Sequence, residues 1–211
     1  MSEQENVHIP EQQQPQEEVI QKESMTWQKS LAMYLHDLVY LLCICMVALL
    51  LVFRVVIVSG SSMYDTLVDG DYLILLSNTF YHNPEQGDIV VLSKRSFDNG
   101  TPIVKRVIAT EGQTVDIDFN AGIVYVDGAA LEEPYIYSPT DVNGGTQFPL
   151  TVAEGCIFVL GDNRGVSRDS RYPEIGMVDK REILGKAIFL LVPGTHYDQL
   201  TRDFGRMGMI E

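Results

Sequence analysis

An uncharged apolar run near the amino terminus constrains this chain more than any other feature. Residues 38–53 read LVYLLCICMVALLLVF, and the apolar character resumes after Arg54 as far as Val58. A helix over residues 38–58 would be about 31 Å long, enough to span the hydrocarbon core of a bilayer. Arg54 lies near the end of the run, where its side chain can reach the headgroups. We therefore expect residues 27–58 to form an uncleaved transmembrane anchor with its interfacial flank.

Two other interpretations of the run stay open. A cleaved signal peptide would use the small-residue site at residues 58–60, although the segment before the run is long and acidic for that purpose. A buried core helix is the second alternative. Lys22 and Lys29 precede the run and only Arg54 follows it, which favours a cytoplasmic amino terminus and an extracytoplasmic domain.

The composition outside the apolar run excludes several classes of function. Residues 1–26 are rich in Gln and Glu and contain prolines, so we expect this tail to be disordered. The formal net charge is −14 and the chain has no basic stripe, which argues against a nucleic-acid partner. Four histidines and three cysteines lack the spacing of a metal site or a disulfide framework. We expect no metal and no other cofactor.

Residues 59–193 have the pattern of a β domain. Short runs rich in Val and Ile, bounded by turn residues, occur among others at residues 72–76, 88–92 and 103–109. Asp127-Gly128 lies between two such runs and is a strong hairpin signal. No run of helical length and period follows Val58. The expected fold class is mainly β, an antiparallel domain preceded by one N-terminal transmembrane helix, and residues 194–211 read as a frayed C-terminal extension.

Serines and a lysine are the candidates for chemistry. The stretch SGSSMYDTL at residues 59–67 follows the apolar run but lacks the G-x-S-x-G form, and no histidine lies in a recognisable partner motif. Lys105 lies in the apolar stretch IVKRVIA, where neighbouring residues point to opposite faces, so Lys105 and Arg106 cannot both face solvent.

A neutral lysine is a usable base near neutral pH only if its pKa falls. Lowering the pKa of Lys105 from about 10.4 to about 8 takes roughly 3 kcal/mol. Apolar neighbours such as Val58 and Val104 can supply that by desolvation. The alternative to a buried base is that Lys105 lies on an edge strand and extends its charged end into solvent.

A polar segment near the end of the domain supplies further candidates. The stretch VLGDNRGVSRDSR at residues 159–171 presents Ser167, Asp169 and Arg171 at alternating positions, which share a face if the chain is extended. Asp169 can then pair with Arg171 or Arg106. An ordinary solvated turn is the alternative.

Taken in order, these segments resemble the bacterial type I signal peptidases, membrane-anchored Ser-Lys proteases that remove signal peptides from exported proteins. The resemblance rests on a span followed by GSSMYDT at residues 60–66, GDIV at 87–90, KRVIATEG at 105–112 and GDNRGVSRDSR at 161–171. It covers the chain from the span to about residue 193, in the same order as in the family. It implies a signal-peptidase-like antiparallel β fold of the compact Gram-positive type.

The resemblance also implies roles for single residues. Ser62, which precedes Met63, would be the nucleophile, Lys105 the general base and Ser167 the side chain that orients the lysine. Asp169, Arg171 and Arg106 would form the ion pairs that fix the catalytic strands. The Ser62 N–H would donate a hydrogen bond to the oxyanion, and the backbone of the loop around Gly60, Ser61 and Met63 would surround it. Val58 and Val104 would line shallow pockets for small side chains.

The implied partners are preprotein signal peptides and the lipid bilayer of a bacterial cell membrane. Two departures from the family pattern bear on the chemistry. Asp65 replaces a proline, and we expect its carboxylate to point away from the cleft, because a negative charge there would raise the pKa of Lys105. Gly60 offers no hydroxyl as a second oxyanion donor. An inactive anchored homologue that only binds exported segments, and a self-cleaving Ser-Lys protease, are the competing functions.

Overall fold

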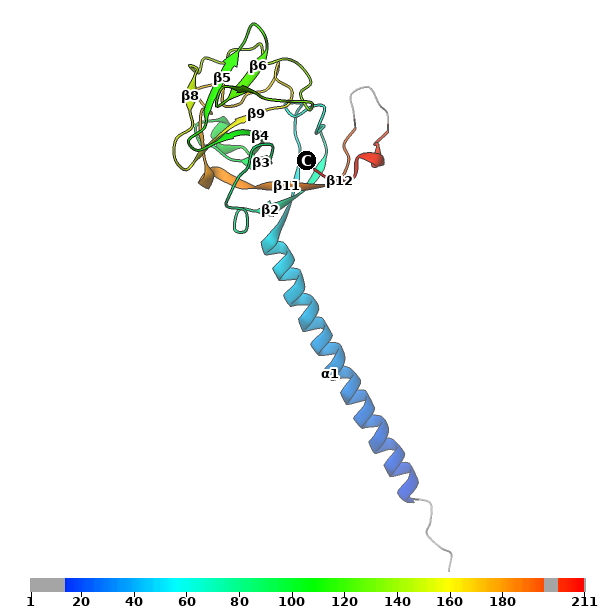
Figure 1. The fold of residues 1–211 in the computed structure, drawn as a ribbon. Coiled ribbons are helices and arrows are strands. Elements are labelled where there is room, and N and C mark those ends of the chain that lie inside the picture. The colour runs from blue at the N-terminus through cyan, green and yellow to red at the C-terminus, as the bar shows by residue number, and fades with distance from the viewer. Residues whose placement is uncertain (1–13, 196–200, 211) are drawn as a thin grey trace, which may run out of the picture. The chain divides into compact units, whose positions relative to one another are not determined.

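The computed structural model describes residues 14–195 and 201–210, with side chains from residue 26 onward, and is drawn in Figure 1. The chain divides into two compact units, Met1–Leu49 and Leu50–Glu211. The first unit consists of most of a single helix, α1 (Gln14–Val52). The second unit contains every strand of the described residues and all of the candidate site residues.

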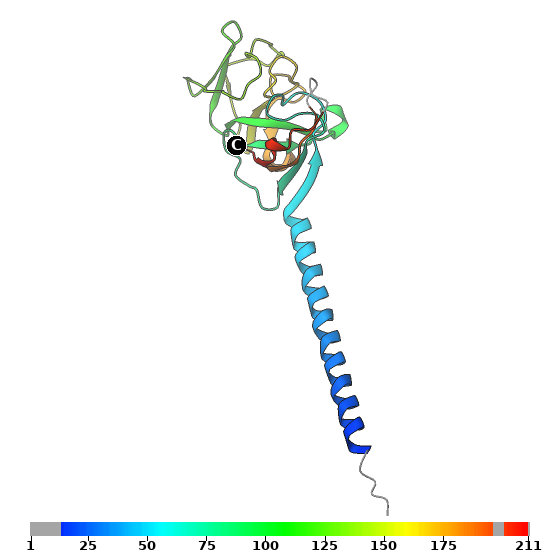
Figure 2. The ribbon, with the colours of Figure 1, turned by 90° about the vertical axis from the view of Figure 1, so that its right-hand side faces the viewer.

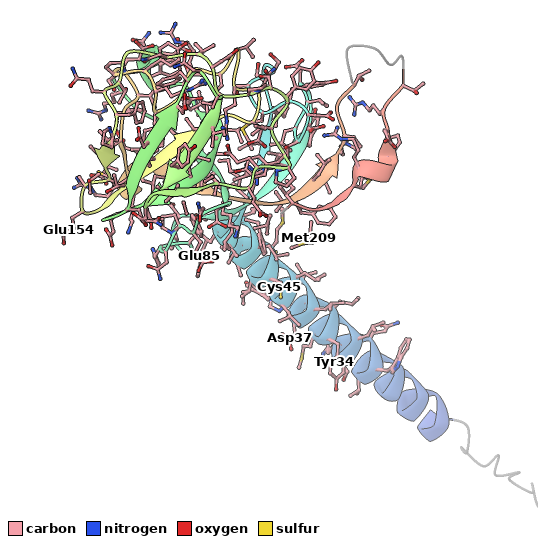
Figure 3. The ribbon with its side chains drawn as sticks, turned by 45° about the horizontal axis from the view of Figure 1, so that its top comes forward. Tyr34, Asp37, Cys45, Glu85, Glu154 and Met209 are labelled. Carbon is pink, nitrogen blue, oxygen red and sulfur yellow. The ribbon has the colours of Figure 1, made fainter. Side chains whose placement is uncertain are left out.

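Helix α1 begins inside the segment that was expected to be disordered. The prediction has to be corrected for residues 14–26, where straight-chain Gln and Glu side chains favour a helix despite their polarity. Residues 1–13 lie outside the described residues. The portion Thr26–Val52 is long and apolar enough to cross a membrane. Its side chains, such as Tyr34, Asp37 and Cys45 in Figure 3, project outward and are exposed, which argues against a buried core helix.

The end of the apolar run is a strand and not part of the helix. Strand β1 (Phe53–Ile57) follows α1 directly and pairs with β2 (Tyr72–Ser77), so the expected helix over residues 38–58 is six residues too long. Its β-branched residues favour a strand once a partner is available. The next N–H, that of Val58, donates to the Asp71 carbonyl at 2.8 Å. Cleavage at residues 58–60 would remove an edge strand of the domain.

The larger sheet carries the catalytic candidates. In the described residues its order is β1-β2-β11-β3-β4-β9-β10, with β12 paired to β11, and every pairing is antiparallel. The remaining strands of this sheet are β3 (Ile89–Leu92), β4 (Ile103–Thr110), β9 (Cys156–Leu160), β10 (Val178–Asp179), β11 (Ile183–Val192) and β12 (Gly208–Met209). Figure 2 shows the same strands turned by 90°.

A smaller sheet has the order β7-β6-β5-β8. Its strands are β5 (Thr114–Asp118), β6 (Ile123–Val126), β7 (Ala129–Ala130) and β8 (Leu150–Thr151). The expected hairpin is present between β6 and β7, where Asp127 and Gly128 both have positive φ, at 54° and 80°. The other described helices after Val52 are three short 3₁₀ turns, η1 (Asp98–Gly100), η2 (Lys180–Glu182) and η3 (Phe204–Arg206). The mainly β prediction is confirmed.

The described part of the carboxyl-terminal extension, residues 201–210, is not frayed, and residues 196–200 and 211 lie outside the described residues. Residues 201–210 return to the domain, where β12 pairs with β11 through Phe189↔Met209 and Leu190↔Gly208. Ile210 packs against the core cluster that contains Val58 and Met63. The prediction overlooked these residues because the segment is short and carries little apolar periodicity.

Candidate active site

The candidate nucleophile lies in the loop that joins β1 to β2. We call residues 58–71 the nucleophile loop. The Gly60 N–H donates to Asp69 Oδ1 at 2.8 Å, with Gly60 at a φ of 91° that favours glycine. From the other side, Asn163 donates its N–H to the Ser62 carbonyl at 3.0 Å and its side-chain amide to the Ser61 carbonyl at 3.1 Å. Ser62 is thereby held by contacts on both of its flanks.

Lys105 faces Ser62 from strand β4. Its side chain is buried, and Nζ donates to Ser62 Oγ at 2.8 Å and to the Val104 carbonyl at 2.8 Å. Desolvation by burial lowers the pKa of Lys105 to about 8. The charges of Asp169 and Asp162 oppose this shift, and that of Arg171 adds to it. The structure thus provides the depressed pKa that the sequence argument required, and the solvent-reaching alternative is wrong.

Arg106 is buried as well, because β4 is covered on both faces. Its ion-pair partner is Asp162. Its Nε and Nη2 donate to the two carboxylate oxygens of Asp162 at 3.0 and 2.8 Å. Asp162 also accepts the Thr66 hydroxyl at 2.6 Å, which ties this ion pair to the nucleophile loop. Asp162, which the predicted set of ion-pair residues did not include, is therefore the ion-pair partner of Arg106.

The other expected ion pair is present. Arg171 Nε and Nη2 each lie 2.9 Å from an oxygen of Asp169, and both side chains are fully buried. Asp169 also accepts the Gly161 N–H at 3.1 Å. The segment is a series of turns and not an extended strand, since the Ser167 N–H donates to the Asn163 carbonyl at 3.0 Å. The condition for a shared face, an extended chain, is therefore not met, although the Asp169–Arg171 pair forms.

Ser167 does not hydrogen-bond Lys105. Its Oγ is buried and has no hydrogen-bond partner within the described residues. It lies close to the nucleophile, because a Cβ added to Gly161 would be 2.1 Å from Ser167 Oγ and 2.5 Å from the Ser62 carbonyl oxygen. Because Gly161 has no side chain, Ser62 and Ser167 can both pack closely against its Cα. The orienting role of Ser167 stays a prediction from the resemblance.

An apolar cavity of about 100 Å³ opens beside Ser62 and Lys105. Val58 and Val104 are among its lining residues, together with Ser59 and Met63, as expected for pocket walls. The Ser62 N–H donates no hydrogen bond to any other described residue, which leaves it available to an oxyanion. Gly60 does not line the cavity, whereas Ser59 does, so Ser59 brings the loop's only cavity-lining hydroxyl besides Ser62 among the described residues.

Asp65 lies along a different hollow. That hollow is lined by Asp65, Thr66 and residues 134–137, and it shares no described lining residue with the cavity beside Lys105. Asp65 is exposed and is not among the charges that shift the pKa of Lys105. This placement agrees with the expectation that its carboxylate points away from the cleft.

Sequence reasoning missed the residues that connect the loops. These residues are Asp162, Asn163 and Arg164. Arg164 is fully buried, and its Nη1 donates to Glu133 Oε2 at 3.0 Å. The signal was present, since GDNR contains all three residues, but a turn motif says nothing about which distant side chain each residue will meet.

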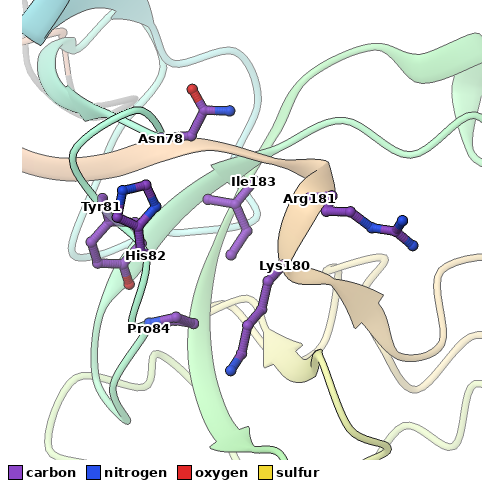
Figure 4. Close-up of a pocket in the computed structure, with 7 residues that line it drawn as sticks. All are labelled: Asn78, Tyr81, His82, Pro84, Lys180, Arg181 and Ile183. Atoms are coloured by element: carbon purple, nitrogen blue, oxygen red, sulfur yellow. The ribbon is translucent and has the colours of Figure 1, made fainter.

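The third hollow, shown in Figure 4, is lined by His82, Lys180 and Arg181 among others. Its cations already have partners, because Lys180 pairs with Glu111 and Arg181 with Asp179. The described residues contain no group of three or more His, Cys, Asp or Glu side chains that could hold a metal ion.

Comparison with known proteins identifies the family of the chain. The family model described as signal peptidase, peptidase S26, matches residues 31–192. The chain is 38% identical over 150 residues to a probable signal peptidase I-1 of Synechocystis sp., covering 68% of this chain and 73% of that protein. It is 35% identical over 149 residues to signal peptidase I of Bacillus amyloliquefaciens, covering 67% and 75%.

A crystal structure of a signal peptidase I from Enterococcus faecalis V583 aligns with 32% identity and a TM-score of 0.40, covering 49% of this chain and 96% of that chain. Relatives of similar identity come from a cyanobacterium and from Bacillus, so they do not distinguish the Gram-positive type. The family match extends over well more than half of the sequence and includes every candidate site residue. The chain belongs to the signal peptidase family, peptidase S26.

Proposed function

We propose that this signal peptidase cleaves signal peptides from exported preproteins with Ser62 as nucleophile and Lys105 as general base. One observation carries the assignment. A buried lysine amine with a pKa of about 8 lies 2.8 Å from the hydroxyl of a serine that lines an open cavity. A base and a nucleophile within hydrogen-bond distance meet the geometric requirement for an activated serine.

The reaction follows from these two groups. Neutral Lys105 accepts the Ser62 hydroxyl proton while Oγ attacks the scissile carbonyl carbon, and the Ser62 N–H binds the resulting oxyanion. Collapse breaks the C–N bond, and the Lys105 ammonium returns its proton to the leaving amine. Lys105 then takes a proton from water as that water attacks the acyl-enzyme, and it returns this proton to Ser62 Oγ as the ester C–O bond breaks, which releases the signal peptide as a carboxylic acid and restores neutral Lys105 and the Ser62 hydroxyl.

The cavity suits a substrate with small residues before the cut. Its volume of about 100 Å³ and its Val58 and Val104 walls suit a small apolar side chain. Ser59 is the described hydroxyl that can serve as second oxyanion donor in place of Gly60. The proposed substrates therefore carry small apolar side chains at the first and third positions before the scissile bond.

The anchor and its orientation complete the proposal. The helix over Thr26–Val52 would hold the enzyme in a bacterial cell membrane, with the amino terminus in the cytoplasm and residues 59–193 outside. The support for this orientation is the placement of Lys22 and Lys29 before the apolar run that begins at residue 38. Assignment to the compact Gram-positive type stays a prediction from the sequence resemblance.

The test is preprotein processing by the full chain in detergent, with the cut site read by mass spectrometry. Ser62→Ala and Lys105→Ala should each lower processing by about a thousandfold or more. Ser96→Ala and Lys180→Ala, a serine and a lysine that do not line the cavity beside the dyad, are the matched controls and should process normally. Equal processing by wild type and both dyad variants would refute the assignment.

Two outcomes of the same experiment would support the competing functions. Binding of the preprotein without cleavage by wild type would indicate an inactive homologue. Cleavage of the enzyme's own chain, with the preprotein left intact, would indicate a self-cleaving protease.

A further inference from the structure

The carboxyl-terminal segment, residues 201–210, lies outside the part of the chain that matches the family model. It is nevertheless attached to the catalytic domain. Strand β12 pairs with β11, and the Ile210 N–H donates to the Ile188 carbonyl at 3.2 Å. Met209, labelled in Figure 3, is exposed, whereas Ile210 packs against the cluster of Val58 and Met63. The segment thus packs against the buried side chains of the nucleophile loop.

Arg206 is the contact between this segment and the nucleophile loop. Its Nη1 and Nη2 donate to the two carboxylate oxygens of Asp71 at 3.0 and 2.9 Å, and Nη2 also donates to the Thr66 carbonyl at 3.1 Å. Asp71 is fully buried at the end of the loop and accepts the Val68 N–H at 2.9 Å and the Gly194 N–H at 2.6 Å. One guanidinium therefore ties the middle of the nucleophile loop to its end.

The same loop carries the nucleophile. From Thr66, the connection continues through its hydroxyl to Asp162 at 2.6 Å, and Asp162 pairs with Arg106, the neighbour of Lys105. The Leu67 N–H, next to Thr66, donates to the carbonyl of Met63 at 2.8 Å, and Met63 is the residue that follows Ser62. A shift of Thr66 would therefore move Ser62 relative to Lys105.

We propose that the carboxyl-terminal segment acts, through Arg206, as a positioning element that holds the nucleophile loop in its reactive shape. The inference rests on the proposed roles of Ser62 and Lys105. Arg206 does not line the cavity beside them, so it acts on the distance between nucleophile and base and not on substrate binding. A lysine cannot replace it fully, because an ammonium lacks the planar fork that meets both Asp71 oxygens and the Thr66 carbonyl together.

The expected signature is a loss of kcat without a loss of binding. Misplacement by about 1 Å can cost on the order of a hundredfold, so kcat of Arg206→Ala should fall by at least about tenfold while KM changes less than about twofold. Arg206→Lys should recover part of this loss. Added guanidinium ion, at millimolar concentrations, should raise kcat of Arg206→Ala by filling the vacated position.

The experiment uses the full-length enzyme in detergent, well below the unfolding temperature of each variant, with a preprotein substrate. Arg202→Ala, an exposed arginine of the same segment, is the matched control and should keep the wild-type kcat. Guanidinium should have no effect on wild type or on Lys105→Ala. A wild-type kcat in Arg206→Ala, or a reduced kcat that neither lysine nor guanidinium restores in part, would overturn the inference.

The outcomes separate this inference from the proposed function. If wild-type processing does not depend on Ser62 and Lys105, the proposed function fails. If it does depend on them and Arg206→Ala has the wild-type kcat, only the role of the carboxyl-terminal segment fails.

Discussion

Replacing Lys105 with methionine should abolish peptidase activity and yet stabilise the folded protein near neutral pH. Burial lowers the pKa of Lys105 from 10.5 to about 8. At about 1.36 kcal/mol per pKa unit, keeping this lysine in the fold costs roughly 3 kcal/mol at pH 7, where the unfolded chain would hold it protonated in water. Methionine has a similar length and no charge to desolvate.

The net gain is smaller because two hydrogen bonds are lost. Lys105 donates to Ser62 Oγ and to the Val104 carbonyl. At about 1 kcal/mol for each bond, the variant should be more stable than wild type by about 1 kcal/mol at pH 7.

The dependence on pH is the sharper test. Since the folded pKa of Lys105 lies below its unfolded value, the unfolded state binds more protons between the two values, and wild-type stability rises with pH in that window. From pH 7 to pH 9.5 the cost of burial should fall by about 2 kcal/mol. The order of stabilities should therefore reverse, with Lys105→Met less stable by about 1 kcal/mol at the higher pH.

Urea unfolding of the detergent-solubilised chain, followed by near-ultraviolet circular dichroism at several pH values, measures this difference. Ser62→Ala is the control, because it also removes activity but retains Lys105, and it should keep the wild-type dependence on pH. A free-energy difference between wild type and Lys105→Met that stays constant from pH 7 to 9.5 would refute the depressed pKa.

Further predictions concern activity and the neighbouring network. The kcat/KM for a preprotein should rise about fiftyfold from pH 6 to pH 8, with its half-point near the Lys105 pKa of about 8, and a half-point below 7 would contradict this. Gly161→Ala would place a methyl group 2.1 Å from Ser167 Oγ and 2.5 Å from the Ser62 carbonyl oxygen, so kcat/KM should fall by about a hundredfold. Gly165→Ala, where the nearest atom is 3.5 Å away, is its control. Asp169→Asn leaves the fully buried Arg171 guanidinium unpaired and should cost about 3–5 kcal/mol in urea unfolding, and a cost below about 1 kcal/mol would show that the pair is dispensable. Asp65→Asn should leave the half-point of the pH profile unchanged, and a decrease by a full pH unit would place Asp65 in the cleft.

The sequence predicted those features that depend on neighbouring residues. The apolar run indicated one long helix, the alternation of Val and Ile with turn residues indicated a β domain, and Asp127-Gly128 indicated its hairpin. The order of four motifs then singled out Ser62 and Lys105. Local pattern also misled, because the end of the apolar run looks the same in a helix and in a strand. Pairing with β2 makes residues 53–57 a strand.

Contacts between residues distant in sequence were decided by the tertiary structure alone. Whether Arg106 pairs with Asp162 or Asp169 depends on how the turns after β9 fold back over β4, and no spacing rule encodes that. The same holds for Arg206, which meets Asp71 135 residues away. The sequence by itself determined which groups can donate, accept or lose a proton. Only the packed domain decided that Lys105 is buried, and this desolvation lowers its pKa toward the range where it can act as a base.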